Sequence, residues 1–150
     1  MTEEVEIDLF RSVRVEQFPN GVFDGDMPAQ GILEPDFYPR DLGDGKTRDP
    51  DVHVERIEGI EWVRSGGGTS LFDRPAVFKR AGWLSFELPA GTPIPRSLVI
   101  RNTGYNRVFK ATHYQIESRA QLMTKDAMCG ALDNLARAAI ARSVELARKG

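Results

Sequence analysis

The sequence predicts an α+β fold in which mixed or antiparallel β-sheets are covered on one side by a C-terminal amphipathic helix. Several segments before residue 120 alternate apolar and polar side chains, which is typical of half-buried strands. From Asp126 the apolar residues instead recur at three- and four-residue intervals, which is typical of a helix. At 150 residues the chain has room for one domain with a single core.

The first predicted strand is the alternating segment from Val5 to Arg11. Because side chains alternate across a strand, Leu9 and Arg11 are expected on the face opposite Phe10. Residues 19–51 follow, and their many Gly and Asp residues are interrupted by Pro19, Pro28, Pro35, Pro39 and Pro50. Such a composition predicts a long irregular surface loop that stays outside the core.

The rest of the chain divides into strands and a final helix. The run Ile57–Val63 is compatible with either a short strand or a helical turn. Clear strand candidates, separated by turn residues, are Trp83–Leu88, Ser97–Arg101 and Val108–Glu117. The helix is expected from Asp126 to about Arg148, with Thr124 as its N-cap. Its apolar stripe consists of Met128, Leu132, Leu135 and Ala139.

Composition excludes several classes of protein. The net charge of −2 gives no broad basic field of the kind that nonspecific nucleic-acid binding needs. Cys129 is the only cysteine, so no internal disulfide can form and the fold must work in a reducing cytosol. The acidic N-terminus is unlike a secretory signal peptide, and no apolar run is long enough to span a bilayer. The chain is therefore expected to act in the cytoplasm and to use a dedicated machine if it is exported.

The most informative run is a triple glycine at residues 66–68 followed by Thr69 and Ser70. Glycine lets the backbone turn sharply or approach another group closely. The hydroxyls then enter an apolar segment, so they are expected at a fixed place in the fold. Ordinary turn chemistry, in which a hydroxyl bonds a nearby backbone amide, accounts for them equally well.

A second informative run is the strand candidate that contains His113, Gln115 and Glu117. Residues two apart share a face, so an imidazole, an amide and a carboxylate project together, while Tyr114 and Ile116 face the core. The alternative is a sheet edge with its polar face in solvent.

Neither the remaining histidine nor the thiol carries a predicted role. His53 has no ligand partner at metal-binding spacing, and the sequence predicts no metal site. Cys129 lies beside the apolar stripe of the helix, which favours a buried thiol over a nucleophile. A group of aspartates in the irregular loop matches no calcium-binding spacing.

Four motifs recur in order and resemble the family of the second type VI secretion exported effector of Pseudomonas. They are Gly67–Arg74, Ile94-Pro95, Tyr105-Asn106-Arg107 and Ala111–Tyr114. The likeness covers residues 60–150 well and residues 7–26 more loosely, but residues 27–59 show little similarity. Members of this family are bacterial toxins delivered into rival cells, with a fold similar to that of the ADP-ribosyltransferase toxins. The resemblance therefore implies a single toxin domain over residues 1–150 with NAD as its substrate.

The resemblance also implies roles for individual residues. Arg11 would hold the pyrophosphate of NAD, although a strand cation paired with Glu4 or Asp8 is the simpler interpretation of a lone arginine. Thr69 and Ser70 would brace the nicotinamide side, and His113 would bind the adenosine ribose or orient the substrate. Glu117 would stabilise the ribosyl cation as nicotinamide leaves, with Gln115 positioning the target. Tyr105 and Arg107 could stack on or clamp a nucleotide, or form a simple turn.

Partners and alternatives follow from the same resemblance. A cognate immunity protein, the type VI secretion apparatus and an unknown target macromolecule are the expected partners. The protein would reside in the cytoplasm of the producer and act in the cytoplasm of the recipient. An NAD glycohydrolase, and a non-enzymatic module that binds a partner, are the alternatives to an ADP-ribosyltransferase.

Overall fold

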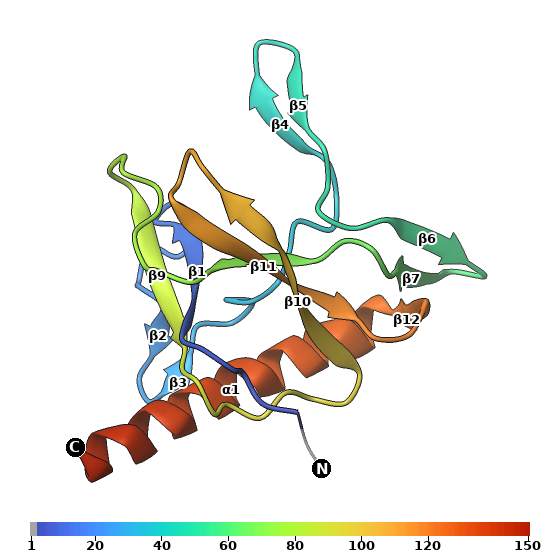
Figure 1. Cartoon of the computed structure of the whole chain (residues 1–150). Helices are drawn as coiled ribbons and strands as arrows, with labels where there is room; N and C mark the ends of the chain where they lie inside the picture. The colour runs from blue at the N-terminus through green and yellow to red at the C-terminus, as the bar shows by residue number, and fades with distance from the viewer. Residues whose placement is uncertain (1–2) are drawn as a thin grey trace.

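A five-stranded antiparallel sheet lies against one long helix in the computed structural model, which describes residues 3–150 (Figure 1). The order of the strands across the sheet is β10-β11-β8-β1-β9. Their bounds are β1 Leu9–Arg14, β8 Thr69–Phe72, β9 Trp83–Leu88, β10 Leu98–Asn106 and β11 Ala111–Ser118. The predicted α+β class with a C-terminal helix is thus confirmed, and all four strand pairings in this sheet are antiparallel.

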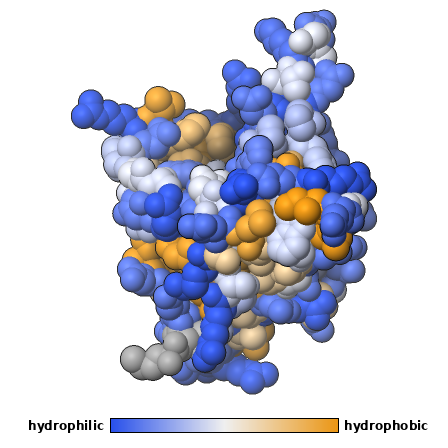
Figure 2. Space-filling model, turned by 90° about the vertical axis from the view of Figure 1, so that its right-hand side faces the viewer, coloured by the Kyte–Doolittle hydropathy of each residue, from blue (hydrophilic) through white to orange (hydrophobic). Residues whose placement is uncertain are grey.

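Three smaller pieces of sheet surround this body. A three-stranded sheet has the order β12-β7-β6, and two hairpins pair β2 with β3 and β4 with β5. The β4–β5 hairpin projects from the body as an arm whose surface is mainly hydrophilic (Figures 1 and 2). The bounds are β2 Phe23–Asp24, β3 Met27–Pro28, β4 Arg40–Gly43, β5 Lys46–Arg48, β6 Val54–Ile57, β7 Ile60–Arg64 and β12 Leu122–Thr124.

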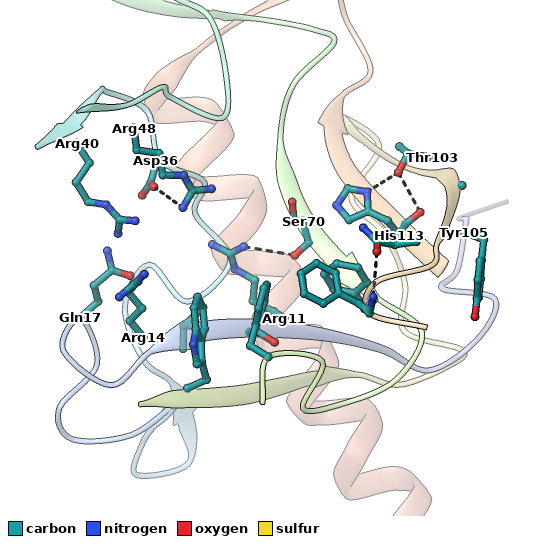
Figure 3. Close-up of a pocket in the computed structure, with 18 residues that line it drawn as sticks. Arg11, Arg14, Gln17, Asp36, Arg40, Arg48, Ser70, Thr103, Tyr105 and His113 are labelled. Atoms are coloured by element: carbon teal, nitrogen blue, oxygen red, sulfur yellow. Dashed lines mark hydrogen bonds and ion pairs between the residues drawn. The ribbon is translucent and has the colours of Figure 1, made fainter. Parts of the chain in front are cut away.

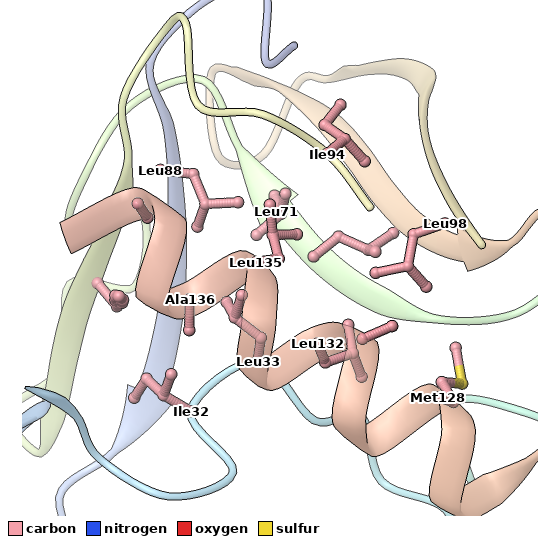
Figure 4. Packing of buried hydrophobic residues seen from close by; sticks show 14 of the residues in the cluster. Ile32, Leu33, Leu71, Leu88, Ile94, Leu98, Met128, Leu132, Leu135 and Ala136 are labelled. Carbon is pink, nitrogen blue, oxygen red and sulfur yellow. The ribbon is translucent and has the colours of Figure 1, made fainter. Parts of the chain in front are cut away.

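Helix α1 spans Lys125–Lys149 and covers one face of the large sheet. Thr124 is the N-cap as predicted, because its hydroxyl accepts a hydrogen bond from the amide of Ala127 at 3.1 Å. The predicted apolar stripe is also confirmed, since all four of its residues are buried. Figure 4 shows this stripe facing leucines of the sheet, with Leu132 and Leu135 on the helix opposite Leu71.

The structure corrects the predicted first strand. Strand β1 begins at Leu9 rather than at Val5, because the chain before it follows another neighbour. The amide of Val5 donates to the carbonyl of Thr92 at 2.8 Å, and Glu4 forms an isolated bridge with Pro93. Alternation alone could not reveal this change of partner.

The run Ile57–Val63 is mostly strand, as one of its two interpretations allowed, because Ile57 ends β6 and Ile60–Val63 belong to β7. It contains the turn of the β6–β7 hairpin, in which Ile57 pairs with Ile60 around Glu58 and Gly59. Both turn residues have positive φ angles, of 50° and 81°. A two-residue turn with this backbone matches the twist of antiparallel strands.

The prediction that residues 19–51 stay outside the core is wrong for part of the segment. Ile32, Leu33 and Phe37 are all buried and belong to the main core cluster. The prolines and glycines break the regular structure into two short hairpins, but they leave this apolar group free to pack. The segment therefore packs against the body at residues 32–37 and then leaves it as the β4–β5 arm.

The triple glycine allows a close approach of the chain to itself. A Cβ atom on Gly68 would lie 1.7 Å from the carbonyl oxygen of Ile116, and one on Gly67 would lie 2.3 Å from that of Asp51. Only glycine therefore lets β8 start directly beside β11. Gly66 supplies the preceding turn, with a φ of +103°.

We expect Gly68→Ala to destabilise the protein by about 3 kcal/mol or more, because the new methyl group must push backbone apart. Gly130→Ala is the matched control, since Gly130 lies within α1 with no atom near its ideal Cβ position. That change should instead stabilise the protein by about 1 kcal/mol. Urea unfolding of both variants measures the difference, and equal stabilities would contradict this explanation of the glycine run.

Candidate functional site

A cleft of about 510 Å³ lies beside the opening between β1 and β8. These two strands pair only at Phe10 and Phe72, whereas β1 pairs with β9 along its whole length. The sheet therefore opens at this point, and residues from both sides face the gap. The lining residues are Arg11, Ser12, Val13, Arg14, Gln17, Asp36, Arg40, Arg48, Ser70, Phe72, Phe78, Trp83, Thr103, Gly104, Tyr105, Asn106, Phe109 and His113.

The two ends of the cleft differ in chemistry (Figure 3). Arginines gather at one end, where Arg14 and Arg11 of β1 face Arg40 and Arg48 of the arm. Aromatic rings form the other end, and there Phe72 packs edge-on against Phe109 at a centroid distance of 5.5 Å. Phe78 and Trp83, a stacked pair whose centroids are 4.3 Å apart, continue this wall back toward the arginines, where Arg14 lies over the Trp83 ring. The cleft thus offers a site for negative charge beside a site for flat rings.

Arg11 holds its position through two main-chain carbonyls. Its guanidinium donates to the carbonyl of Ser70 at 3.3 Å and to that of Glu34 at 3.0 Å. Its Nε atom is buried and has no hydrogen-bond partner. Burial lowers the pKa of Arg11, while Asp51 and Asp36 act in the opposite direction. The group is still a cation at neutral pH, and no carboxylate of the described residues lies within 4.0 Å of it.

Such a cation favours an anionic ligand. A desolvated charge is costly unless an opposite charge compensates for it, and neutral carbonyls do so only in part. The expected alternative partners, Glu4 and Asp8, do not pair with Arg11. Asp8 instead accepts a hydrogen bond from the amide of Ala90 at 2.8 Å.

Ser70 and His113 face the cleft from neighbouring strands. In the pairing of β8 with β11, His113 lies opposite Phe72 and Gln115 lies opposite Ser70. Paired residues of antiparallel strands share a face, so these four side chains project to the same side of the sheet. Tyr114 and Ile116 point to the other side, as alternation predicted, and Ile116 is part of the core.

The imidazole of His113 is fixed by two neighbours. Its Nδ1 shares a hydrogen bond with the hydroxyl of Thr103, which also donates to the main-chain carbonyl of His113 at 3.1 Å. Its ring lies edge-on to Phe72, with centroids 5.1 Å apart. Burial lowers the pKa of His113, so the imidazole is neutral at physiological pH. A neutral imidazole in this position can accept or donate a proton in the cleft.

Three of the predicted site residues do not line the cleft. Thr69 is fully buried, and its hydroxyl donates to the carbonyl of Leu33 at 2.5 Å. Glu117 is 4% exposed and accepts from Nε of Arg101 at 2.7 Å. Gln115 donates from Nε2 to the same carboxylate at 3.0 Å. Thr69 therefore joins β8 to the segment around Leu33, whereas Gln115 and Glu117 form a polar row on the cleft side of β11.

Several lining residues could not be found from the sequence. Arg40 and Arg48 pair with each other at the base of the β4–β5 hairpin in the irregular segment, and no sequence pattern indicated that this hairpin lines the same cleft as β1. Trp83 begins a predicted strand, but which face it lines depends on the pairing with β1. Tyr105 does line the cleft, as one of its two interpretations allowed, while Arg107 is exposed and is not among the lining residues.

The other candidate groups take no part in this site. Burial, followed by the nearby Glu34, raises the pKa of the Cys129 thiol to about 11, which makes it a poor nucleophile. His53 is exposed and lies 3.5 Å from the carboxylate of Glu55. Among residues 3–150 no group of three or more possible ligands is placed to hold a metal ion. In the same range, no helix is long and apolar enough to cross a membrane.

A second cavity, of about 580 Å³, has the wrong charge for an anion. It lies where Tyr114 points, on the side of β11 opposite His113, and includes Ile100 and Leu9. Its rim carries Glu3, Glu4 and Glu6, and no arginine or lysine lines it. A phosphate group would be repelled there, so the arginine-lined cleft is the better candidate for a nucleotide.

Comparison with known proteins shows the family to which the chain is related. A family model described as the Tse2 ADP-ribosyltransferase toxin matches residues 5–144. The chain is also 38% identical over 117 residues to Toxin Tse2 of Pseudomonas aeruginosa, strain PAO1. That alignment covers 78% of this chain and 72% of the relative. The region that matches the family model includes Arg11, Ser70 and His113.

Proposed function

The chain belongs to the family of Tse2 ADP-ribosyltransferase toxins, and from that premise we propose that its arginine-lined cleft binds NAD for transfer of the ADP-ribose group. Membership confirms the resemblance that the sequence motifs indicated. The protein is a bacterial toxin with an ADP-ribosyltransferase domain, a class for which NAD is the substrate. We further propose that residues 1–150 form one domain with the ADP-ribosyltransferase-like arrangement of strands.

One observation supports the cleft above all others. Arg11, Ser70 and His113 are distant in sequence, yet they line a single hollow with a cationic end and an aromatic end. NAD has the matching parts, since its pyrophosphate is anionic and its nicotinamide and adenine are flat rings. Arg11 fits the pyrophosphate because its buried Nε lacks a partner and no carboxylate neutralises its charge. Ser70 then lies next to Arg11, and His113 lies against the ring of Phe72 in the aromatic wall.

The proposed reaction breaks the bond between the nicotinamide ring and its ribose. Nicotinamide leaves with the bonding electron pair, and the ribose carbon becomes a cation. A nucleophilic oxygen or nitrogen of the acceptor attacks this carbon and loses a proton as the new bond forms. The neutral imidazole of His113, which lines the cleft, is positioned to take up that proton.

Glu117 has a supporting position in this proposal. Its carboxylate is buried between Arg101 and Gln115, so it holds the amide of Gln115 on the face that Ser70 shares. A carboxylate that stabilises a ribosyl cation must stand beside that cation, whereas the carboxylate of Glu117 is already paired with a guanidinium.

We therefore expect Glu117→Gln to keep NAD turnover within about threefold of the wild type. The variant should lose about 1–2 kcal/mol of unfolding free energy, because charge-assisted hydrogen bonds become neutral ones. Glu87→Gln, at an exposed position on β9, is the control. A hundredfold loss of turnover with unchanged stability would instead assign Glu117 the direct catalytic role that the family resemblance implies.

Partners and location complete the proposal. A toxin that acts on NAD endangers the cell that makes it, so we propose a cognate immunity protein in the producer. We propose delivery by a type VI secretion apparatus and action in the cytoplasm of the recipient cell, on a macromolecule still to be identified. The similarity to Toxin Tse2 supports these proposals only in that the relative is a toxin of the same family.

Incubation of the purified protein with labelled NAD and a cell lysate tests the function. A labelled macromolecule that fails to form with His113→Ala is the expected result. Free nicotinamide without labelled acceptor would indicate an NAD glycohydrolase, in which water takes the place of the acceptor. The absence of any turnover would overturn the enzymatic proposal and favour a module that acts by binding a partner.

A further inference from the structure

We propose that Arg40 of the β4–β5 arm and Arg14 of β1 form a phosphate-binding subsite at the arginine-lined end of the cleft. This proposal rests on the proposed function, because it concerns how the same cleft holds a dinucleotide. It adds to Arg11 a second group of cations that the sequence motifs did not indicate.

Arg40 has a position that suits ligand binding. It is the first residue of β4, at the base of the arm, and its half-buried side chain lines the cleft. Its Nε atom is buried and has no hydrogen-bond partner. Among residues 3–150, no carboxylate oxygen lies within 4.0 Å of the Arg40 guanidinium, so Arg40 forms no ion pair there. Its neighbour Arg48 differs, because it lies 3.3 Å from Asp51 and 3.7 Å from Asp36. Arg40 therefore carries a cationic charge and a donor that the protein itself leaves unused.

Arg14 faces Arg40 from the opposite side of the cleft. Figure 3 shows the two guanidinium groups pointing toward one another, with Gln17 between the strands that carry them. Arg14 is held over the ring of Trp83, 5.0 Å from its centroid. Its acidic neighbour is Glu16, at 3.7 Å, whose side chain is 79% exposed and so screens the charge weakly. Two cations that face each other repel unless an anion lies between them.

Phosphate is the anion that fits this pair. Guanidinium groups bind phosphate oxygens through two parallel N–H donors, and Gln17 adds a neutral amide nearby. Asp36 is the one carboxylate among the residues that line the cleft, and Arg48 lies beside it. Two phosphates of a dinucleotide could occupy the subsite. One is the pyrophosphate that NAD and NADP share, and the other is the 2′-phosphate that only NADP carries.

Calorimetric titration with three ligands tests the subsite. Sodium pyrophosphate, NAD and NADP are titrated into the wild type, Arg40→Gln, Arg40→Lys and the control Arg56→Gln, each made by cell-free synthesis. Arg56 is exposed on β6, in the β6–β7 hairpin, and lies outside the cleft. Arg40→Gln should weaken pyrophosphate binding at least tenfold, Arg40→Lys should weaken it less, and Arg56→Gln should leave it within twofold. Arg14→Gln repeats the test from the other side of the cleft if Arg40→Gln does not fold.

The dinucleotides distinguish the source of the phosphate. Parallel weakening of NAD and NADP places the pyrophosphate in the subsite, and weakening of NADP alone places the 2′-phosphate there. Binding of all three ligands by Arg40→Gln within twofold of the wild type would overturn the proposal, as would a wild type that binds none of them. Arg40-dependent binding of pyrophosphate without binding of NAD would sustain the subsite but overturn the proposed function. Tight NAD binding that does not depend on Arg40 would overturn the subsite but sustain the proposed function.

Discussion

Replacing His113 by alanine is expected to abolish the growth arrest that the wild-type toxin causes when it is expressed inside bacteria. The imidazole lines the cleft and is held by Thr103 and Phe72, so it acts from a fixed position. Alanine keeps the strand but removes the only histidine at this site. We expect NAD turnover to fall at least hundredfold, the usual cost of losing a positioned acid–base group. Growth curves after induction, without an immunity partner, measure the effect.

The second histidine of the chain provides the matched control. His53→Ala removes an exposed imidazole that lies outside the cleft, so this variant should remain fully toxic. Ser70→Ala should behave like His113→Ala, whereas Ser85→Ala, on an exposed position of β9, should not. Full toxicity of His113→Ala at normal protein levels would contradict the assignment. Normal growth with abundant soluble wild-type protein would count against the toxin itself.

Arg11→Met should remove NAD binding while it leaves the fold nearly as stable as before. The guanidinium is the cation expected to hold the pyrophosphate, and loss of a partly buried charge partner typically weakens binding at least hundredfold. Stability should change by less than about 2 kcal/mol. Methionine loses the two hydrogen bonds to carbonyls of Ser70 and Glu34, but it also removes a charge that is costly to bury.

Two measurements on Arg11→Met separate binding from folding. Calorimetric titration with NAD reports the loss of affinity, and urea unfolding reports the stability. Arg56→Met, at an exposed position of β6, should change neither quantity. A variant that unfolds easily yet binds NAD normally would show that Arg11 supports the sheet rather than the ligand.

Local patterns predicted those parts of the fold that depend on local chemistry. The helix followed from its apolar stripe and from the N-cap at Thr124, and both features act within one or two turns. Strand β9 was predicted with its observed bounds, because alternation and flanking turns define it. The start of strand β1 was predicted too early, because the chain before Leu9 pairs with residues near Thr92, far away in sequence.

The site was predictable only where alternation sets the face of a strand. Alternation placed His113 and Gln115 on one side of β11 and Ile116 in the core. It could not show that the cleft ends before Gln115, because the cleft is lined by segments that are distant in sequence, among them the arm and the β10–β11 hairpin. Arg40 shows the same limit, since a hairpin within a proline-rich segment gives no signal of the strand that it faces.

The burial of Ile32 and Leu33 illustrates a limit of composition. Prolines and glycines correctly indicated broken regular structure, but they say nothing about whether the apolar residues between them pack into a core. These two residues pack with the helix and sheet, and the neighbouring Glu34 offers its carbonyl to Arg11. The irregular segment thus takes part in shaping the site.

The most direct test of the NAD site is an amide NMR titration with an NAD analogue that cannot lose nicotinamide. A methylene group in place of the ring oxygen of the nicotinamide ribose prevents cleavage, so binding is observed without reaction. The amide signals of Ser70, Gly104 and His113 are predicted to shift, with smaller changes elsewhere. Shifts confined to Ile7, Asn102 and Tyr114, around the second cavity, would contradict the placement of NAD in the arginine-lined cleft.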